Sequence, residues 1–346
     1  MSRPELRLSA RTLRDNIAAV TSRLDGCELM LVLKDDAYGH GLTWTVETAV
    51  QAGVASFGSY DVRGGLDVRR LVGPEARVFA WATSTDAEID EALLQGIDLG
   101  VGTVEYLHRI IARAEALGAV ARVHLKIDTG LHRNGVLPED WPGAIAQARA
   151  AEAAGQLSLE GIWSHIAEAS DREDDDAQAV FLDAVRAAGA TGPTPAALHL
   201  TASAASWWRP ELRGTVARIG AFCYGIRSAD GPELEGVRPV ARLVAPVARV
   251  EEGRAAIEVG AFDGLPSTLV GARVGTPAGA RVLERIEPFF AQIEGWAGLS
   301  VGDEVTIFGP GEAGESSATT LAERIDTVGE EILTRLSPRI RRVPVD

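Results

Sequence analysis

The segment ELMLVLKDDAYGHG, residues 28–41, starts as an apolar run and ends as a polar, glycine-rich turn. Lys34 is the last residue of the run. An apolar run of this length, bounded by turn residues, is typical of a strand buried on both faces of a parallel sheet. Similar runs recur along the chain, at ASFGSY (55–60), RVFAWA (77–82), IDLGVG (97–102), RVHLKID (122–128), LEGIWSH (159–165), AALHL (196–200) and VARIG (216–220).

Amphipathic stretches separate these runs and predict helices. The clearest one follows Thr103, a suitable N-cap, and stops at Gly118. Its expected apolar face consists of Val104, Leu107, Ile111 and Ala114. Eight strand–helix units over about 200 residues predict an α/β fold, with an N-terminal (β/α)8 TIM-type barrel over residues 1–230. A doubly wound open sheet is the alternative, although no GxGxxG sequence follows the first strand.

The sequence changes character after about residue 230 and predicts a second, mainly β domain over residues 231–346. Glycine and proline turns separate ARLVAPVARVEE (241–252), AAIEVG (255–260), GARVLERIEPFF (279–290) and GDEVTIFG (302–309). One helix is expected near residues 318–326, and residues 1–10 are expected to pair with this domain. The acidic run SDREDDD (170–176) is interpreted as a solvated loop.

Composition excludes several classes of protein. The chain is 46% hydrophobic and 24% charged, so it can bury a large core. No apolar stretch approaches the roughly 18 residues of a membrane span, and the N-terminus has no apolar signal region. A net charge of −15 argues against nucleic-acid binding. Two cysteines form no disulfide framework, which favours a reduced, cytoplasmic protein.

Only two of the 34 basic residues are lysines, Lys34 and Lys126. Arginine replaces lysine where a positive charge suffices, but a guanidinium stays protonated and cannot act as a nucleophilic amine. The two lysines are therefore candidates for chemistry. A lysine at the end of an apolar strand is suited to a Schiff base, with either a carbonyl substrate or pyridoxal 5'-phosphate (PLP).

Several motifs resemble the alanine racemases, PLP-dependent enzymes of fold-type III. LVLKDDAYGHG resembles that family's VVKADAYGHG signature, and KIDTGLHRNG (126–135) resembles its KxDTGMxRxG segment. Further matching segments follow in the family's order: GIWSH (161–165), HLTASAA (199–205), RIGAFCYG (218–225), VGDEVTIFG (301–309) and EILTRLSPRIRRV (331–343).

The resemblance implies PLP as cofactor, an amino-acid substrate and a role for each matching residue, with no metal. Lys34 would hold PLP as a Schiff base and move a proton at Cα. Tyr38, Ser203 and the backbone of Gly220 would bind the phosphate. Arg218 would face the pyridine nitrogen, with His165 beside the ring. Arg133 would contact the substrate carboxylate, and Lys126 would orient Arg133. The family also implies a head-to-tail homodimer in which the β domain completes the partner's site.

The chain departs from the family in the part of the site that the partner would supply. The family's GYxDGY-like motif reads GAFDGLP (260–266), with Ala261 in the place of a catalytic tyrosine. The RVCMDQ segment reads RIEPFF (285–290), and a further tyrosine that usually contacts the phosphate aligns with Glu330.

These departures favour a reaction on one face of the substrate, because racemisation needs a proton carrier on each face. Lys34 supplies one. The sequence therefore predicts one-face PLP chemistry such as decarboxylation or elimination, a lyase reaction. Two alternatives remain: an isomerase that racemises or epimerises alanine or another amino acid, and a non-catalytic PLP-binding protein. Arg218 would keep the pyridine nitrogen unprotonated, which disfavours transamination.

Overall fold

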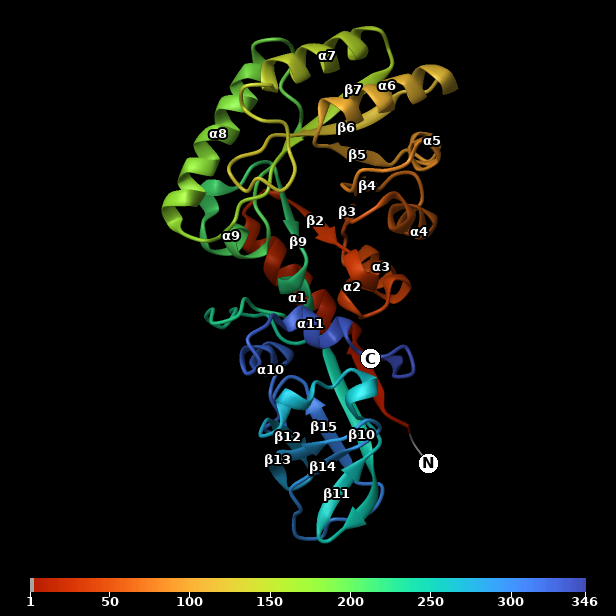
Figure 1. Cartoon of the computed structure of the whole chain (residues 1–346), viewed down its shortest axis with the longest axis vertical. Helices are drawn as coiled ribbons and strands as arrows, with labels where there is room; N and C mark the ends of the chain where they lie inside the picture. Colours follow the sequence, from red (N-terminus) through yellow and green to blue (C-terminus); the bar gives the residue numbers. More distant parts are fainter. Residues whose placement is uncertain (1–2) are drawn as a thin grey trace. The chain divides into compact units, whose positions relative to one another are not determined.

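The computed structural model describes residues 3–346, which form two compact units (Figure 1). The barrel unit comprises residues 20–34 and 50–220, and the β unit comprises residues 3–19, 35–49 and 221–346. This grouping assigns residues 3–19 and 35–49, together with the C-terminal part of the chain, to the β unit. The first strand pairs with strands near the C-terminus, so it belongs to the β unit.

All eight strands expected in the barrel are present. They are β2 (Glu28–Val32), β3 (Ser56–Ser59), β4 (Arg77–Ala80), β5 (Asp98–Val101), β6 (Ala121–Lys126), β7 (Leu157–Trp163), β8 (Ala197–His199) and β9 (Val216–Ile219). They are parallel, in the order β9-β2-β3-β4-β5-β6-β7-β8. The ring closes where the amide of Arg218, in β9, donates to the Thr201 carbonyl, just after β8, at 3.3 Å. The TIM-type barrel is confirmed, and the open-sheet alternative is wrong.

The helices that connect these strands lie outside the ring (Figure 1). They are α4 (Val62–Val72), α5 (Asp86–Leu94), α6 (Val104–Leu117), α7 (Trp141–Ala153), α8 (Asp171–Gly189) and α9 (Ser203–Trp208). Helices α1 (Ala10–Leu24) and α3 (Leu42–Gln51) each contain residues of both units.

Helix α6 has the expected ends, with Thr103 as N-cap and Gly118 in the left-handed conformation at the C-cap. Its buried face differs from the expected one. Tyr106, Leu107, Ile110 and Ala114 are buried, whereas Val104 and Ile111 are only half-buried. The apolar stripe is broad enough for either choice, and packing against β5 and β6 selects the face.

The acidic run at residues 170–176 is not a loop, so that interpretation is wrong. Ser170 caps α8, and its hydroxyl accepts from the amide of Glu173 at 3.3 Å. Asp171, Glu173 and Asp174 occupy the first turn of the helix. Carboxylates there are stabilised by the partial positive charge of the helix N-terminus.

An aromatic cluster fills part of the barrel interior. Met30, Phe79 and Trp163 are buried together with Ala197 and Val216, and Trp81 packs against them. Gly100 in β5 makes this packing possible, because a Cβ there would lie 2.9–3.0 Å from atoms of Trp81, Phe79 and Trp163. Close packing of this kind fixes side chains in single orientations.

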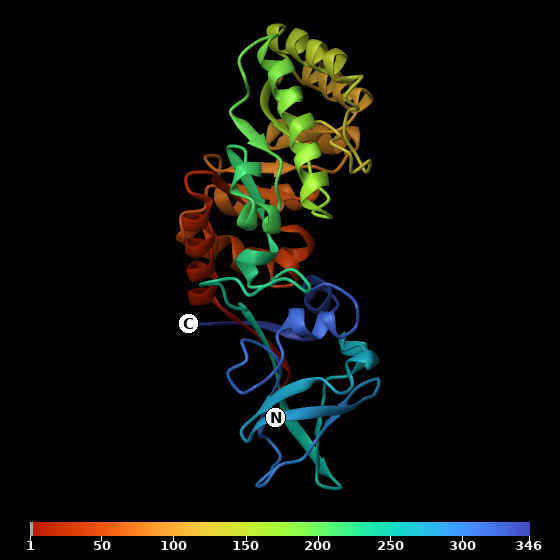
Figure 2. The same cartoon turned by 90° about the vertical axis from the view of Figure 1, so that its left-hand side faces the viewer.

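The β unit is built on strands β1 (Glu5–Ser9), β10 (Ala241–Glu251), β11 (Arg254–Ile257), β12 (Arg273–Thr276), β13 (Gly279–Ile286), β14 (Ala291–Ile293), β15 (Glu304–Phe308) and β16 (Arg341–Val345). Strands β10 to β15 close into an antiparallel ring in the order β10-β11-β14-β13-β12-β15. Strand β1 extends it through β10, and β16 pairs with β1 in parallel. The long strand β10 runs through this unit in both cartoon views (Figure 2).

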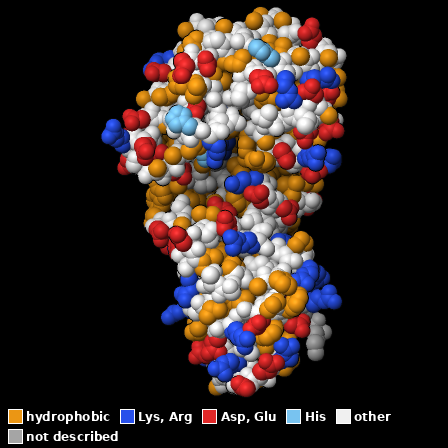
Figure 3. Space-filling view, in the orientation of Figure 1, with side chains coloured by type: hydrophobic (Ala, Val, Ile, Leu, Met, Phe, Trp, Pro, Cys, Tyr) orange, Lys and Arg blue, Asp and Glu red, His pale blue; other side chains and the backbone are white. Residues whose placement is uncertain are grey.

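Two short helices, α10 (Ala318–Glu323) and α11 (Gly329–Thr334), complete the β unit, so the expected helix near residues 318–326 is followed by a second one. Among the described residues, no helix is long and apolar enough to cross a membrane. On the face seen in Figure 3, acidic and basic side chains are interspersed, and the net charge of −15 does not form a single patch there.

Candidate functional site

Lys34 follows strand β2 and is half-buried. The backbone after it turns sharply, because Asp35, Asp36, Ala37 and Tyr38 all have φ near +55° and form a left-handed turn, labelled α2 (Lys34–Tyr38). Residues other than glycine adopt this conformation at a cost of about 1–2 kcal/mol each. The Asp36 carboxylate stabilises the turn by accepting from the amide of Leu42 at 2.7 Å. Strain of this kind is concentrated at functional sites.

His165 lies near several cationic side chains and contacts one of them, Arg218, at 3.2 Å. Burial lowers the pKa of His165 to about 3, and the charges of Arg218, Arg133, Lys126 and Lys34 lower it further. These four cations all lie within electrostatic range of the same imidazole. The structure therefore brings together five of the predicted site residues, and His165 is neutral at physiological pH.

Arg218, in β9, is only 5% exposed. Its guanidinium donates to the carbonyl oxygens of Ser164 at 2.7 Å and His199 at 2.8 Å, and to the ring nitrogens of His199 at 3.0 Å and His165 at 3.2 Å. Burial lowers the pKa of Arg218 to about 9, against the opposing charge of Glu168. The guanidinium is therefore still charged at neutral pH, in a fixed orientation.

Lys126, the last residue of β6, is 4% exposed, and its Nζ lies 4.8 Å from the centre of the Trp163 ring. Burial lowers the pKa of Lys126 to about 8, helped by the charges of Arg133 and Arg218. Lys126 is therefore a neutral amine in a fraction of the molecules at physiological pH. Arg133 is exposed, in a loop shaped by Asp128, whose carboxylate accepts from the amides of Gly130 and His132.

Ser203 and Gly220 come together across the ends of α9 and β9. The Gly220 amide donates to the Ser203 hydroxyl at 3.3 Å, and Ser203 is the first residue of α9. Because the Gly220 amide is engaged by the hydroxyl oxygen, the Ser203 O–H is the donor that this pair offers to an anion.

Tyr38 alone among the predicted site residues belongs to the β unit. It is buried, and its ring lies 5.0 Å from that of Tyr224. Burial raises the pKa of the Tyr38 phenol, and the charge of Glu330 raises it further. Tyr38 therefore stays protonated and acts as a hydrogen-bond donor.

Sequence reasoning missed three polar residues behind Arg218. Asp98, His124 and His199 are buried inside the barrel, where His199 contacts Arg218 directly. The available signal was a polar side chain within an otherwise apolar strand, as in VHLK and ALHL. Such a residue is buried only with a partner, and the sequence does not say which one.

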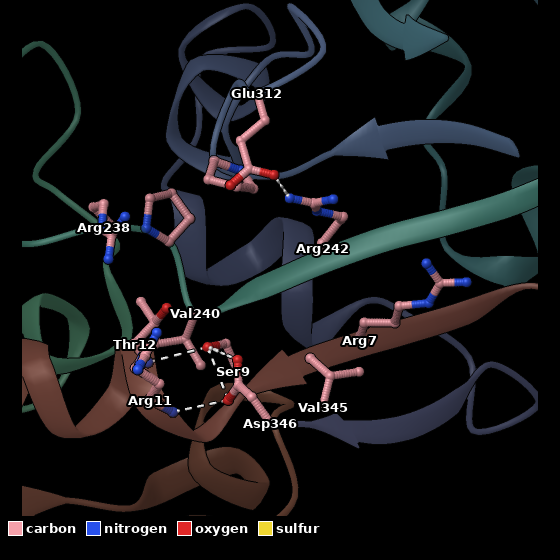
Figure 4. Close-up of a pocket in the computed structure, with 12 residues that line it drawn as sticks. Arg7, Ser9, Arg11, Thr12, Arg238, Val240, Arg242, Glu312, Val345 and Asp346 are labelled. Atoms are coloured by element: carbon pink, nitrogen blue, oxygen red, sulfur yellow. Dashed lines mark hydrogen bonds and ion pairs between the residues drawn. The ribbon is translucent and has the colours of Figure 1, made fainter. Parts of the chain in front are cut away.

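A separate cavity of about 440 Å³ in the β unit contains none of the predicted site residues (Figure 4). Two of the four arginines that line it, Arg7 and Arg242, are held by acids at short distance. Arg242 contacts Glu312, and Arg7 contacts Glu304. The Asp346 carboxylate accepts from the Ser9 hydroxyl and the Arg11 amide, both at 3.0 Å.

The chain matches two family models along most of its length: alanine racemase, N-terminal domain, over residues 8–228, and alanine racemase, C-terminal domain, over residues 246–344. The chain belongs to the alanine racemase family. An alanine racemase of Thermobifida fusca is 32% identical over 369 residues, covering 98% of this chain and 97% of the relative. One of Beutenbergia cavernae is 33% identical, covering 95% and 94%.

Solved structures of alanine racemases have the same fold. The crystal structure of alanine racemase from D-cycloserine-producing Streptomyces lavendulae has a TM-score of 0.91 and 29% identity, and covers 100% of this chain and 98% of that one. The enzyme of Streptomyces coelicolor has a TM-score of 0.90 at 28% identity. These relatives support an isomerase, the alternative interpretation, better than a decarboxylase or another lyase.

The residues in the barrel unit fit PLP, the cofactor of the alanine racemase family. The half-buried Lys34 amine suits the carbonyl carbon of the cofactor, and the Ser203–Gly220 pair suits its phosphate. Arg218 offers a fixed cation, held over the Trp163 ring with its Cζ 5.3 Å from the ring centre. Each of these groups matches one functional group of PLP in charge and hydrogen-bonding character.

The lowered pKa of Lys126 predicts a pH-dependent stability. In the unfolded chain this pKa returns to the ordinary lysine value of 10.5, whereas in the folded chain it is about 8. Between these values the unfolded chain binds a proton that the folded chain has lost, so the free energy of unfolding rises with pH. We expect the unfolding free energy of the native protein, relative to that of Lys126→Met, to rise by about 2–3 kcal/mol as the pH increases across this range. Urea denaturation at several pH values measures it. A constant difference would show that Lys126 titrates normally.

Proposed function

We propose that the protein is a PLP-dependent amino-acid racemase, with alanine as the first substrate to test. The observation that carries the proposal is the cluster around His165, where both lysines of the chain meet Arg133 and Arg218. Its relatives named alanine racemase support the same reaction. The alanine at position 261 favours one-face chemistry, but the relatives are named alanine racemase and none of those compared is named a decarboxylase or another lyase.

When bound, PLP supplies an electron-withdrawing ring that makes the α-proton of an amino acid removable. Lys34 binds the cofactor and moves the proton on one face of Cα. Arg133, exposed at the end of its loop, binds the substrate carboxylate. Arg218 holds a positive charge at the pyridine nitrogen, with the neutral His165 beside it. Ser203 and Gly220 would bind the phosphate, for which the sequence also predicts Tyr38.

The second face requires another proton carrier, which we propose is supplied by the β unit of a partner in a head-to-tail homodimer. Ala261 carries no titratable group, so the carrier must be a neighbour. Asp263 is held by Arg339 at 2.8 Å, and Glu287 is paired with Arg285. Glu258 is exposed and has no ion pair among residues 3–346. It lines a cavity of about 370 Å³ and is the strongest candidate.

The test is the fate of L- and D-alanine incubated with the PLP-loaded protein in D₂O. We expect each enantiomer to be converted into the other, with deuterium at Cα, as read by chiral chromatography and mass spectrometry. Incorporation of deuterium into only one enantiomer without interconversion, or release of CO₂ or ammonia, would identify one-face chemistry. If no amino acid in a panel exchanges its α-proton, the protein binds PLP without catalysing a reaction.

Both cysteines are free thiols, in accord with a cytoplasmic location.

Glu258 is tested with a matched pair of variants. Glu258→Gln removes the carboxylate and is expected to reduce interconversion about 100-fold or more, while deuterium exchange into one enantiomer continues through Lys34. Glu235→Gln removes a comparable exposed carboxylate elsewhere in the β unit and is expected to have no effect. Equal activity of the two variants would exclude Glu258 as the carrier.

A further inference from the structure

A line of hydrogen-bonded side chains crosses the interior of the barrel and ends at Arg218. The Arg218 guanidinium contacts His199 Nδ1 at 3.0 Å, and His199 Nε2 contacts His124 Nδ1 at 2.8 Å. His124 Nε2 in turn contacts the Asp98 carboxylate at 3.1 Å. Asp98, His124 and His199 are at most 1% exposed. The line joins three strands, β5, β6 and β8, to β9.

The two ends of the line determine every proton position within it. A guanidinium can only donate, so His199 Nδ1 must be an acceptor and the ring proton of His199 must be on Nε2. That proton is donated to His124 Nδ1, which places the proton of His124 on Nε2, facing Asp98. A carboxylate can only accept, so the last contact is satisfied as well. Both imidazoles are neutral, and every donor points from Arg218 toward Asp98.

The surroundings hold the line in this arrangement. Phe79 lies 4.8 Å from the His124 ring and 5.2 Å from the His199 ring, and Trp163 stacks on His199 at 5.8 Å. Gly161 leaves room for His124, because a Cβ there would lie 2.2 Å from its Nδ1. These apolar walls leave the imidazoles no alternative hydrogen-bond partner on the sides they cover.

The far end of the line is anchored by two further arginines. Arg122 donates to Asp98 at 2.6 Å, and Arg77 lies 3.6 Å from the same carboxylate. Burial by itself would raise the pKa of Asp98, but the hydrogen bonds from His124 and Arg122 outweigh it and keep the pKa low. Burial also lowers the pKa of His199 well below its usual value, with a further contribution from Arg218. Asp98 thus stays charged and His199 stays neutral.

We propose that Asp98 and His124 are positioning residues that act through His199 to fix the orientation and charge of Arg218. The negative charge of Asp98 polarises the two imidazoles in sequence, so that His199 Nδ1 is a stronger acceptor for the guanidinium. Arg218 is then held as a cation aimed at one place in the barrel. The effect on turnover rests on the proposed function, whereas the proton arrangement does not.

Nuclear magnetic resonance tests the arrangement without any turnover. The chain has six histidines, so two-bond ¹H–¹⁵N spectra of protein labelled at histidine resolve each ring, and His124→Gln and His199→Gln assign the two signals. We expect both rings to be neutral with the proton on Nε2, with and without PLP. An Nδ1-protonated or doubly protonated ring at neutral pH would overturn the proposal.

Asp98→Asn then tests the consequence, because it keeps the shape of the side chain and removes its charge. We expect a shift of the His199 Nδ1 signal and about a tenfold loss of kcat with little change in KM, partly restored in Asp98→Glu. Asp90→Asn is the matched control, since it removes a carboxylate paired with Arg113 on the outside of the barrel. If Asp98→Asn fails to fold, Gly161→Ala displaces His124 and is expected to give the same shift.

The outcomes separate this proposal from the function itself. An unshifted His199 signal in folded Asp98→Asn would overturn the proposed positioning role of Asp98, even if the protein racemises alanine. If the proton arrangement is as proposed but the protein has no racemase activity, the hydrogen-bonded line is supported and the proposed reaction is wrong.

Discussion

Lys34→Arg is expected to abolish racemisation while the protein remains folded. The substitution keeps a positive charge at a half-buried position, but a guanidinium neither forms the covalent link to PLP nor exchanges a proton near neutral pH. We expect a loss of about 10³-fold or more in kcat/KM, the range typical of losing a general acid–base together with a nucleophile. Chiral chromatography measures the activity, and circular dichroism checks the fold.

Lys126→Arg is the matched control, because it makes the same change at the other lysine of the chain. Lys126 is expected to act by orienting Arg133, so its loss should reduce activity less than that of Lys34. Borohydride reduction of the PLP-loaded protein, followed by peptide mapping, should place the label on Lys34. A label on Lys126, or an active Lys34→Arg variant, would contradict the assignment.

The barrel could be predicted from the sequence because each of its strands is buried on both faces. Such strands are continuous apolar runs, and all eight were found from this pattern. Strands β12, β14 and β16 of the β unit were not identified. They have three to five residues each, and β16 (RRVPV) has charged residues and a proline, as suits a strand at the edge of a sheet.

The acidic run before α8 shows where local reasoning failed. Its charge density suggested a loop, but the N-cap at Ser170 and the favourable position of acids at a helix N-terminus outweigh the repulsion among them. The capping residue was visible in the sequence, and the charge count was given too much weight.

Some residues of the candidate site could be predicted from the sequence, and others could not. Lys34 and Lys126 could be singled out because arginine replaces lysine almost everywhere else. The line from Arg218 to Asp98 could not, because its members lie on strands far apart in the sequence. His124 and His199 meet across the barrel from β6 and β8, which are separated by β7. Only the register of the closed barrel places them together.

Arg218→Met is expected to lower the free energy of unfolding by about 3–5 kcal/mol, because it leaves several buried acceptors without a donor. Methionine fills much of the volume of the arginine stem but donates no hydrogen bond. The carbonyl oxygens of Ser164 and His199, and the ring nitrogens of His199 and His165, would then lose their donor inside the barrel. A buried acceptor without a partner costs about 1–3 kcal/mol, so two or three such groups account for the total.

Two further variants show whether this cost comes from the network. Arg218→Lys keeps the charge but has fewer donors and a shorter reach, so it should recover only part of the loss. Arg113→Met removes an arginine from an ion pair with Asp90 on the barrel exterior and should cost less than about 1 kcal/mol. Urea denaturation without PLP measures all three, so the result does not depend on cofactor binding. If Arg218→Met were no more costly than Arg113→Met, Arg218 would not be holding the strand ends together. Its buried contacts would then matter for ligand binding alone.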